Sequence, residues 1–214
     1  MFDGLVERYD LLNRLMTFGL DGRWRRQAIS ALELTPGDRI LDLGCGTGDL
    51  LELLADARAR PTGIDVSAAM LGRAQQRLSG RALLARGSAF ELPFAAGSFQ
   101  GAVSGFVLRN LRDLEGAMAE LARVIAPGGR IALLDATEPA GWVRPLFDAW
   151  FRVATPALGA LAGKRAAYQY LSRSLVQIPP AREMCRLLGA AGFREPAARP
   201  LTFGAVTLFT GRRA

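Results

Sequence analysis

The chain has 214 residues, half of them hydrophobic, and its 27 basic and 20 acidic side chains give a formal net charge of +7. This length and composition indicate one globular domain whose core needs neither a metal nor a disulfide. The only cysteines, Cys45 and Cys185, exclude a disulfide framework and favour a reduced, cytoplasmic setting. Histidine is absent, which excludes Ser-His-Asp and Cys-His nucleophile systems, imidazole bases and histidine metal sites. We therefore expect chemistry that uses carboxylates, arginines, tyrosines or a bound cofactor, and no metal.

The positive charge is concentrated in the last third of the chain. Residues 139–178 carry five bases and one acid, and residues 179–214 carry six and two. A basic surface suits anionic lipid headgroups or nucleic acid, although 26 arginines against one lysine are equally typical of a GC-rich genome. No signal peptide and no run of about 18 uncharged apolar residues is recognisable, so we expect a soluble protein.

Short strand-like runs alternate with helical stretches from residue 39 onward. In chain order, the pattern predicts strands at 39–43, 63–66, 82–85, 99–106 and 130–135, and helices at 49–57, 67–78 and 111–125, the second capped by Ser67 and the third stopped by Pro127-Gly128-Gly129. A helix at 181–191 and strands at 193–197 and 203–210 follow, the two strands forming an antiparallel hairpin. This order predicts an α/β, Rossmann-like fold: a mostly parallel sheet of seven strands, covered by helices on both faces, with ligands at the carboxyl ends of the strands.

Two segments lie outside this repeat, within what we expect to be a single domain spanning residues 1–214. Residues 1–33 predict a helical cap in which Trp24, Ile29 and Leu32 face the sheet or a cleft. Residues 139–178 form an aromatic-rich helical insertion, interrupted by prolines. A long insertion on the ligand side of such a sheet predicts a lid, and a contact in a homodimer is the alternative.

The segment LDLGCGTGDL, residues 41–50, runs from a strand through a glycine loop into a helix. Gly44, Gly46 and Gly48 allow backbone angles and close approach that a Cβ would prevent. A dinucleotide-binding loop would have a third glycine where Asp49 stands, and an acid there would repel a pyrophosphate. NAD and FAD are therefore disfavoured.

A cationic ligand without phosphate fits these residues better. Asp42 and Asp49 can bind an ammonium group, and Asp65, at the end of the second strand, can accept both hydroxyls of a ribose. We interpret Cys45 as a small filler in the loop. This arrangement resembles the class I methyltransferases, whose cofactor is S-adenosylmethionine (SAM), and the resemblance implies that Ser88 and Ala89 lie at the adenine edge.

Nearly the whole chain resembles one family, the ubiquinone/menaquinone biosynthesis C-methyltransferases. The resemblance rests on MFDGLVERYDLLNRLMTFGLDGRW at the N-terminus and on FVLRNLRD (106–113), RVIAPGG (123–129), YQYLSRSLVQIP (168–179) and AGFREPAARPLTFGAVTLFTG (191–211). The chain departs from the family pattern at Asp21, where a histidine is usual, at Ala126, and at Asp135 to Thr137, where Glu-x-Ser is usual.

The resemblance implies a cofactor site and a reaction. The expected cofactor-binding residues are Asp42, Gly44, Gly46, Thr47, Gly48, Asp65, Ser88, Ala89 and Gly105. The implied reaction is methylation of a ring carbon of a prenylated hydroquinone such as demethylmenaquinol. Because a guanidinium stays cationic and can stabilise a phenolate oxygen, Arg109 is the leading catalytic candidate, with Asn110 orienting it or the substrate. Tyr9, Asn13 and Tyr168 are expected to bind the substrate.

Several alternatives stay open at the level of sequence. Arg109 could instead pair with Asp113, and Tyr168 could be a packing residue. An O- or N-methyltransferase for another small aromatic molecule would share every SAM residue, and a SAM- or lipid-binding module without catalysis is the non-enzyme alternative. The sequence does not favour nucleic acid as a partner, because the Asn/Asp-Pro-Pro-aromatic run typical of base N-methylation is missing after the fourth strand. A prenylated substrate is consistent with a cytoplasmic protein that makes transient peripheral contact with the inner face of the membrane.

Overall fold

The computed structural model describes residues 17–139, 141–145, 147, 149 and 178–214. Its strands form one seven-stranded sheet in the order β3-β2-β1-β4-β5-β7-β6. All neighbours pair in parallel except β7, which runs antiparallel to both β5 and β6. The strands are β1 (Arg39–Leu43), β2 (Arg60–Asp65), β3 (Leu83–Arg86), β4 (Phe99–Gly105), β5 (Ile125–Ala136), β6 (Phe193–Leu201) and β7 (Val206–Arg213). The predicted fold class and the closing hairpin are confirmed.

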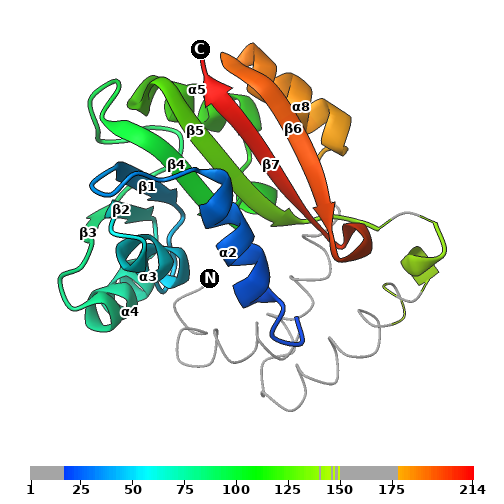
Figure 1. Ribbon diagram of the computed structural model, residues 1–214, viewed down its shortest axis with the longest axis horizontal. Helices are drawn as coiled ribbons and strands as arrows, with labels where there is room; N and C mark the ends of the chain where they lie inside the picture. Colours follow the sequence, from blue (N-terminus) through cyan, green and yellow to red (C-terminus); the bar gives the residue numbers. More distant parts are fainter. Residues whose placement is uncertain (1–16, 140, 146, 148, 150–177) are drawn as a thin grey trace.

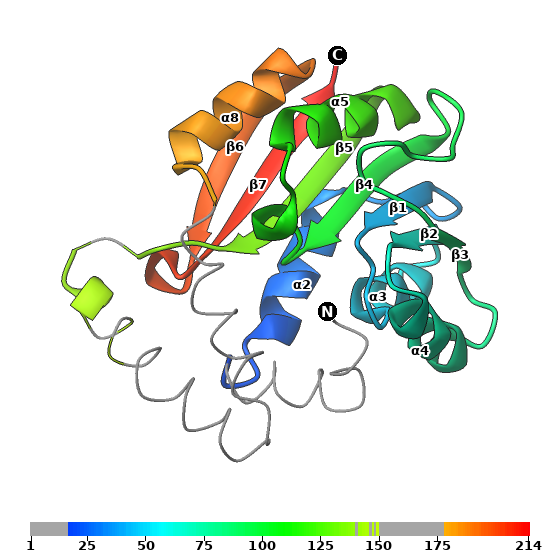
Figure 2. The same ribbon diagram turned by 180° about the vertical axis from the view of Figure 1, so that it is seen from behind.

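Helices cover both faces of this sheet. They are α2 (Asp21–Ala31), α3 (Asp49–Asp56), α4 (Ala68–Leu78), α5 (Leu114–Val124) and α8 (Ala181–Ala190). Helices α2, α3 and α4 lie on the face turned towards the viewer in Figure 1, and α5 and α8 lie on the face seen in Figure 2. A short 3-10 helix, η1 (Leu108–Asn110), follows β4, and a second, η3 (Thr202–Gly204), joins β6 to β7.

The alternation of side chains along the strands divides the core into two layers. Leu41 and Leu43 of β1 point towards α5 and α8, whereas Ile40 of the same strand packs with α2, α3 and α4. Trp24 of the cap helix is buried in the second layer, and its Nε1 donates a hydrogen bond of 2.8 Å to Thr202 Oγ1. The cap helix is therefore joined to the C-terminal hairpin, and the expected inward position of Trp24 and Leu32 is confirmed.

The helix boundaries follow capping side chains. Ser67 Oγ accepts the Met70 N–H at the start of α4, as predicted. Helix α5 begins at Leu114, three residues later than predicted, because the Asp113 carboxylate accepts the Gly116 N–H and ends the preceding loop.

Two predicted strands begin later than the observed ones. Strand β2 starts at Arg60, where the sequence pattern predicted residue 63. Strand β5 starts at Ile125 and includes Pro127-Gly128-Gly129, which the sequence pattern had marked as a stop. Ile125 pairs with Phe99 and Arg130 pairs with Gly101, so the residues between Ile125 and Arg130 form a bulge at a register shift and pairing with β4 resumes after it.

Candidate active site

The glycine loop turns at the carboxyl end of β1, beside the end of β2. Each glycine meets a different requirement, and all three have positive φ angles, between 53° and 93°. A Cβ on Gly44 would collide with Val107, and one on Gly48 would crowd Leu78 at 3.2 Å. A Cβ on Gly46 would meet no atom within 4 Å, so this glycine faces open space. The loop is thus held tightly on two sides and open at Gly46, as a ligand-binding loop requires.

Asp42 is a buried carboxylate without a partner. It is 1 % exposed, and among the described residues neither of its oxygens has a hydrogen-bond partner. Burial raises the pKa of Asp42 to about 8, an effect that Arg25 partly offsets and that the charges of Asp65 and Asp49 strengthen. A buried group of this kind requires a partner, and a cationic ligand group supplies one. The residue therefore fits the ammonium of SAM.

Asp65 occupies the end of β2 and is tied to the glycine loop. Its Oδ2 accepts the Gly46 N–H at 2.9 Å and its Oδ1 accepts the Ser67 N–H at 2.8 Å. A carboxylate has about four acceptor positions, so these two bonds fix its orientation and leave capacity for ligand hydroxyls. The side chain is only partly buried. This geometry fits the expected role in binding a ribose.

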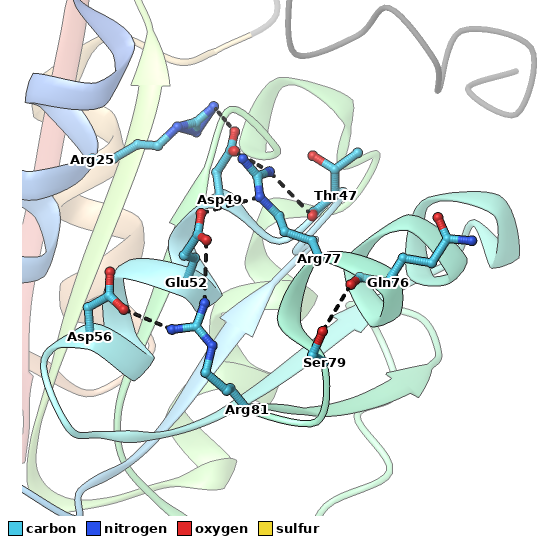
Figure 3. Close-up of polar contacts among 9 residues, drawn as sticks. All are labelled: Arg25, Thr47, Asp49, Glu52, Asp56, Gln76, Arg77, Ser79 and Arg81. Carbon is cyan, nitrogen blue, oxygen red and sulfur yellow. Dashed lines mark hydrogen bonds and ion pairs between the residues drawn. The ribbon is translucent and has the colours of Figure 1, made fainter.

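Asp49, the first residue of α3, forms ion pairs with two arginines. Its Oδ2 lies 2.9 Å from Arg25 Nη2, and its Oδ1 lies 2.5 Å from Arg77 Nη1. Figure 3 shows the carboxylate between these two arginines, one from α2 and the other from α4. Both oxygens of Asp49 therefore already have a cationic partner, which the sequence did not indicate, and its expected bond to an ammonium group stays a prediction.

The remaining expected cofactor contacts lie around this loop. Thr47 is buried in the loop, and its carbonyl oxygen lies 3.5 Å from Arg77 Nη1. Ser88 and Ala89 lie just after β3. The N–H of Gly87, between Ser88 and the end of that strand, donates to the Asp65 carbonyl, and Ser88 Oγ accepts the Phe90 N–H. Gly105 ends β4, where a Cβ would lie 3.0 Å from Leu50 Cδ1 and 3.7 Å from Arg25 Nη1. These residues gather at the carboxyl ends of β1 to β4, the edge predicted for ligands.

Cys45 is a buried loop residue. Burial, together with the charges of Asp42 and Asp65, raises the pKa of its thiol far above the usual range. Since the thiolate is the nucleophilic form, this environment fits the interpretation of Cys45 as a filler.

Arg109, in η1, is buried and paired with Asp135 at the end of β5. Its Nη1 donates to Asp135 Oδ1 at 3.0 Å, and its backbone N–H donates to Oδ2 at 3.2 Å. The Ala136 N–H also donates to Oδ1. Burial raises the pKa of Asp135, and the charge of Arg109 opposes that rise. The alternative pairing of Arg109 with Asp113 is wrong, because Asp113 caps α5 instead.

Phe106 separates the two arginines of this region. Its φ angle of 62° is unusual for a bulky residue, and it presents the ring between Arg25 and Arg109. Their guanidinium carbons lie 5.5 Å and 5.7 Å from the ring centroid. Asn110 Nδ2 lies 3.5 Å from the Phe106 carbonyl oxygen. One strained residue therefore connects the glycine-loop side of the site with η1.

Three expected substrate contacts, Tyr9, Asn13 and Tyr168, lie outside the described residues, as does most of the expected lid at 139–178. Their roles stay predictions. In the described part of the chain, no helix is both long and apolar enough to cross a membrane.

The sheet order, the reversed β7, the glycine loop after β1 and the acid after β2 define a class I SAM-dependent methyltransferase. Solved structures support this fold. A SAM-dependent methyltransferase from Aquifex aeolicus superposes with a TM-score of 0.70 at 16% identity, covering 99% of this chain and 98% of its own. Phosphoethanolamine N-methyltransferase 2 of Haemonchus contortus, solved with S-adenosylhomocysteine, gives 0.67 at 16% identity, covering 88% and 52%.

The chain belongs to the ubiE/COQ5 methyltransferase family, whose model matches residues 1–213. It is 40% identical to a demethylmenaquinone methyltransferase of Thermus thermophilus, over the full length of both chains. It is 38% identical to another from Desulfitobacterium hafniense, covering 99% of this chain and 88% of the relative. It is 39% identical to the ubiquinone/menaquinone biosynthesis C-methyltransferase of Syntrophotalea carbinolica, covering 100% and 93%. The family resemblance, the enzyme class and the SAM dependence expected from the sequence are confirmed.

The sequence did not predict the contacts that three residues make in this site: Arg25, Phe106 and Asp135. Asp135 was marked only as a departure from the family pattern. Its partner Arg109 is 26 residues away, and a pairing over that distance leaves no local signal. Arg25 had a weak signal, since it stands one residue after the buried Trp24 on a helix predicted to face the sheet.

Proposed function

We propose that the protein methylates a ring carbon of a prenylated hydroquinone, converting demethylmenaquinol to menaquinol or acting on the corresponding benzoquinol of the ubiquinone pathway. The names of its relatives support this substrate class. The observation that carries the proposal is the buried Arg109–Asp135 pair beside the glycine loop, because it holds a permanent cation next to the cofactor site without a histidine.

Methylation at carbon requires an electron-rich ring. Loss of the proton from a ring hydroxyl places charge on the oxygen and on the carbon ortho to it. Arg109 would stabilise that oxygen with the N–H groups that Asp135 does not engage, since a guanidinium has five donors. SAM, when bound, supplies the electrophilic methyl group on its sulfonium.

Asp135 acts on the ring through Arg109 rather than by contact. Its two oxygens accept the Arg109 side chain and backbone N–H, which fixes η1 against β5. Arg109 is too basic to accept the hydroxyl proton itself. The hydroxyl proton would therefore leave to water or to a carboxylate, and the resulting phenolate oxygen would pair with the guanidinium. The proton of the ring carbon that accepts the methyl group would leave afterwards to the same kind of acceptor, which restores the aromatic ring.

The tail of a prenylated substrate resides in a bilayer, so we infer that the enzyme meets it at a membrane surface. An exposed aromatic pair supports this contact. Trp142 and Phe203 are 75 % and 74 % exposed, with ring centroids 6.2 Å apart. Interfacial aromatic rings of this kind favour the headgroup region of a bilayer, and the segment from 139 to 178 adds a net charge of +4.

The direct test incubates the purified protein with SAM and three reduced acceptors: demethylmenaquinol, a demethylated benzoquinol of the ubiquinone pathway, and a catechol. We expect a C-methylated product from one of the quinols, identified by mass spectrometry and carbon NMR. A product methylated at oxygen, or activity with the catechol alone, would favour a small-molecule O-methyltransferase instead.

A further inference from the structure

Arg25 lies where three elements of the cofactor site meet. From α2 it reaches Asp49 at the first turn of α3, with Nη2 2.9 Å from Oδ2, and Asp21 on its own helix, with Nε 3.7 Å from Oδ2. Its guanidinium also faces the Phe106 ring and approaches Gly105 at the end of β4. Helix α2 thus places the Arg25 guanidinium at the edge of the sheet where the glycine loop turns (Figure 3).

The guanidinium is buried but incompletely paired. The side chain is 10% exposed, and within the described residues Nε has no hydrogen-bond partner. Of its terminal nitrogens, only Nη2 makes a close ion pair there. Buried donors in folded proteins are almost always satisfied, so this orientation indicates a missing acceptor on the side that Asp49 does not occupy.

The charges of the loop indicate what that acceptor is. Three carboxylates surround the loop: Asp42, Asp49 and Asp65. SAM carries an ammonium and a sulfonium, which suit these acids, and also a carboxylate, which they repel. That carboxylate needs a cation inside the site. Arg77 is less suitable, because its other contacts, Thr47 O and Glu52 Oε2, draw it towards the α3–α4 surface and its side chain is 27% exposed.

We propose that Arg25 binds the carboxylate of the methionine moiety of SAM, with Asp49 holding the guanidinium in position. The cap helix is then part of the cofactor site. The inference rests on the SAM dependence of the enzyme and is independent of the quinol acceptor, so the two proposals fail separately.

The test compares two ligands that differ only in this carboxylate, SAM and decarboxylated SAM, by titration calorimetry. Wild-type protein is expected to bind SAM at least tenfold more tightly. Arg25→Gln should weaken SAM binding at least tenfold and leave the affinity for decarboxylated SAM within about twofold. Arg77→Gln, which removes the other arginine partner of Asp49, is the matched control and should retain the wild-type preference.

Two outcomes would overturn the proposal. If wild-type protein bound both ligands equally, no group of the protein would recognise the carboxylate. If Arg25→Gln weakened both ligands equally, Arg25 would only tie α2 to α3. Thermal unfolding without ligand checks that each variant folds, and should Arg25→Gln not fold, the wild-type comparison and Arg25→Lys, which retains charge but loses the planar fork, still decide the question.

Discussion

The Asp135 carboxylate binds Arg109 twice, through the side chain at 3.0 Å and through the backbone N–H at 3.2 Å. The catalytic candidate is therefore fixed in orientation before any substrate arrives. Such preorganisation lowers the cost of stabilising a charge that develops during reaction. In the proposed mechanism, which stabilises a phenolate anion, the acid at the end of β5 has the role of positioning the cation.

Replacing Arg109 separates catalysis from cofactor binding. We expect Arg109→Ala to lower turnover at least a hundredfold, as the loss of one oxyanion-type contact does, and to change the affinity for SAM by less than about threefold. Steady-state kinetics and calorimetry measure the two effects. Wild-type turnover in this variant would remove Arg109 from the mechanism.

Replacing Asp135 tests the positioning role. Asp135→Asn keeps the volume of the side chain but leaves the Arg109 guanidinium without its buried counter-charge, so we expect turnover to fall at least tenfold. The free energy of unfolding should also fall by about 3–5 kcal/mol, measured by urea denaturation. Asp113→Ala is the control: it removes the cap of α5, costs about 1 kcal/mol, and should leave turnover per folded molecule unchanged. Equal losses of turnover in the two variants would contradict the positioning role.

Much of the fold could be predicted from local patterns. The bounds of β1 and the Ser67 cap of α4 match the prediction, because a strand entering a glycine loop and a serine before a helix are local signals. The start of β5 was missed because its pairing with β4 overrides a Pro-Gly-Gly sequence that normally ends an element. Tertiary contacts, which local propensity does not contain, decide such boundaries.

The arrangement of the candidate site was predictable only where its residues belong to one sequence motif. The three glycines and Asp65 lie together as expected. The ion pairs of Asp49 were missed because its partners, Arg25 and Arg77, approach from other helices, 24 and 28 residues away. Likewise, Trp24 and Thr202 are 178 residues apart. Ion pairs between elements depend on how the helices pack, which the sequence pattern does not specify.

Asp65→Ala tests the ribose assignment. The carboxylate is fixed by Gly46 and Ser67, and its loss removes both the ligand acceptor and a tie to the glycine loop. We expect the affinity for SAM to fall at least tenfold in calorimetry. Asp65→Asn, which can still accept one N–H, should retain part of the affinity, and an unchanged affinity in the alanine variant would show that the assignment is wrong.

Asp42 should make the stability of the ligand-free protein depend on pH. Its pKa is about 8 in the folded protein and 3.8 as the reference value, so between these values the folded state holds a proton that the unfolded chain has lost. The free energy of unfolding should therefore fall as the pH rises towards 8 and level off above it. Asp42→Asn removes this decline, so its stability relative to wild type should increase from pH 6 to pH 8. Urea denaturation at several pH values measures this difference in stability between the variant and the wild type. The charges of Arg25, Asp49 and Asp65, which face Asp42 from α2, α3 and β2, are present in both proteins.

The same residue predicts a proton release on binding. At pH 7 the Asp42 carboxyl is mostly protonated in the empty site, and an ammonium beside it favours the ionised form. The calorimetric enthalpy of SAM binding should then vary with the ionisation enthalpy of the buffer, and this variation should be absent in Asp42→Asn. An enthalpy independent of the buffer in the wild type would contradict the pairing.

The exposed pair Trp142–Phe203 provides the test of membrane contact. Phe203 stands on η3 with a φ of 57°, so a strained turn holds its ring outward beside Trp142. We expect the wild type to co-sediment with vesicles that contain anionic phosphatidylglycerol and its tryptophan fluorescence to shift to the blue. The double variant Trp142→Ser, Phe203→Ser should lose at least tenfold in vesicle affinity, because burial of two aromatic rings contributes several kcal/mol.

The control variant for this test is Phe90→Ser, at another exposed aromatic residue, which should bind like the wild type. If the double variant and the control bound equally well, the aromatic pair would not be the contact, and equal binding to vesicles without anionic lipid would exclude a contribution from the basic segment.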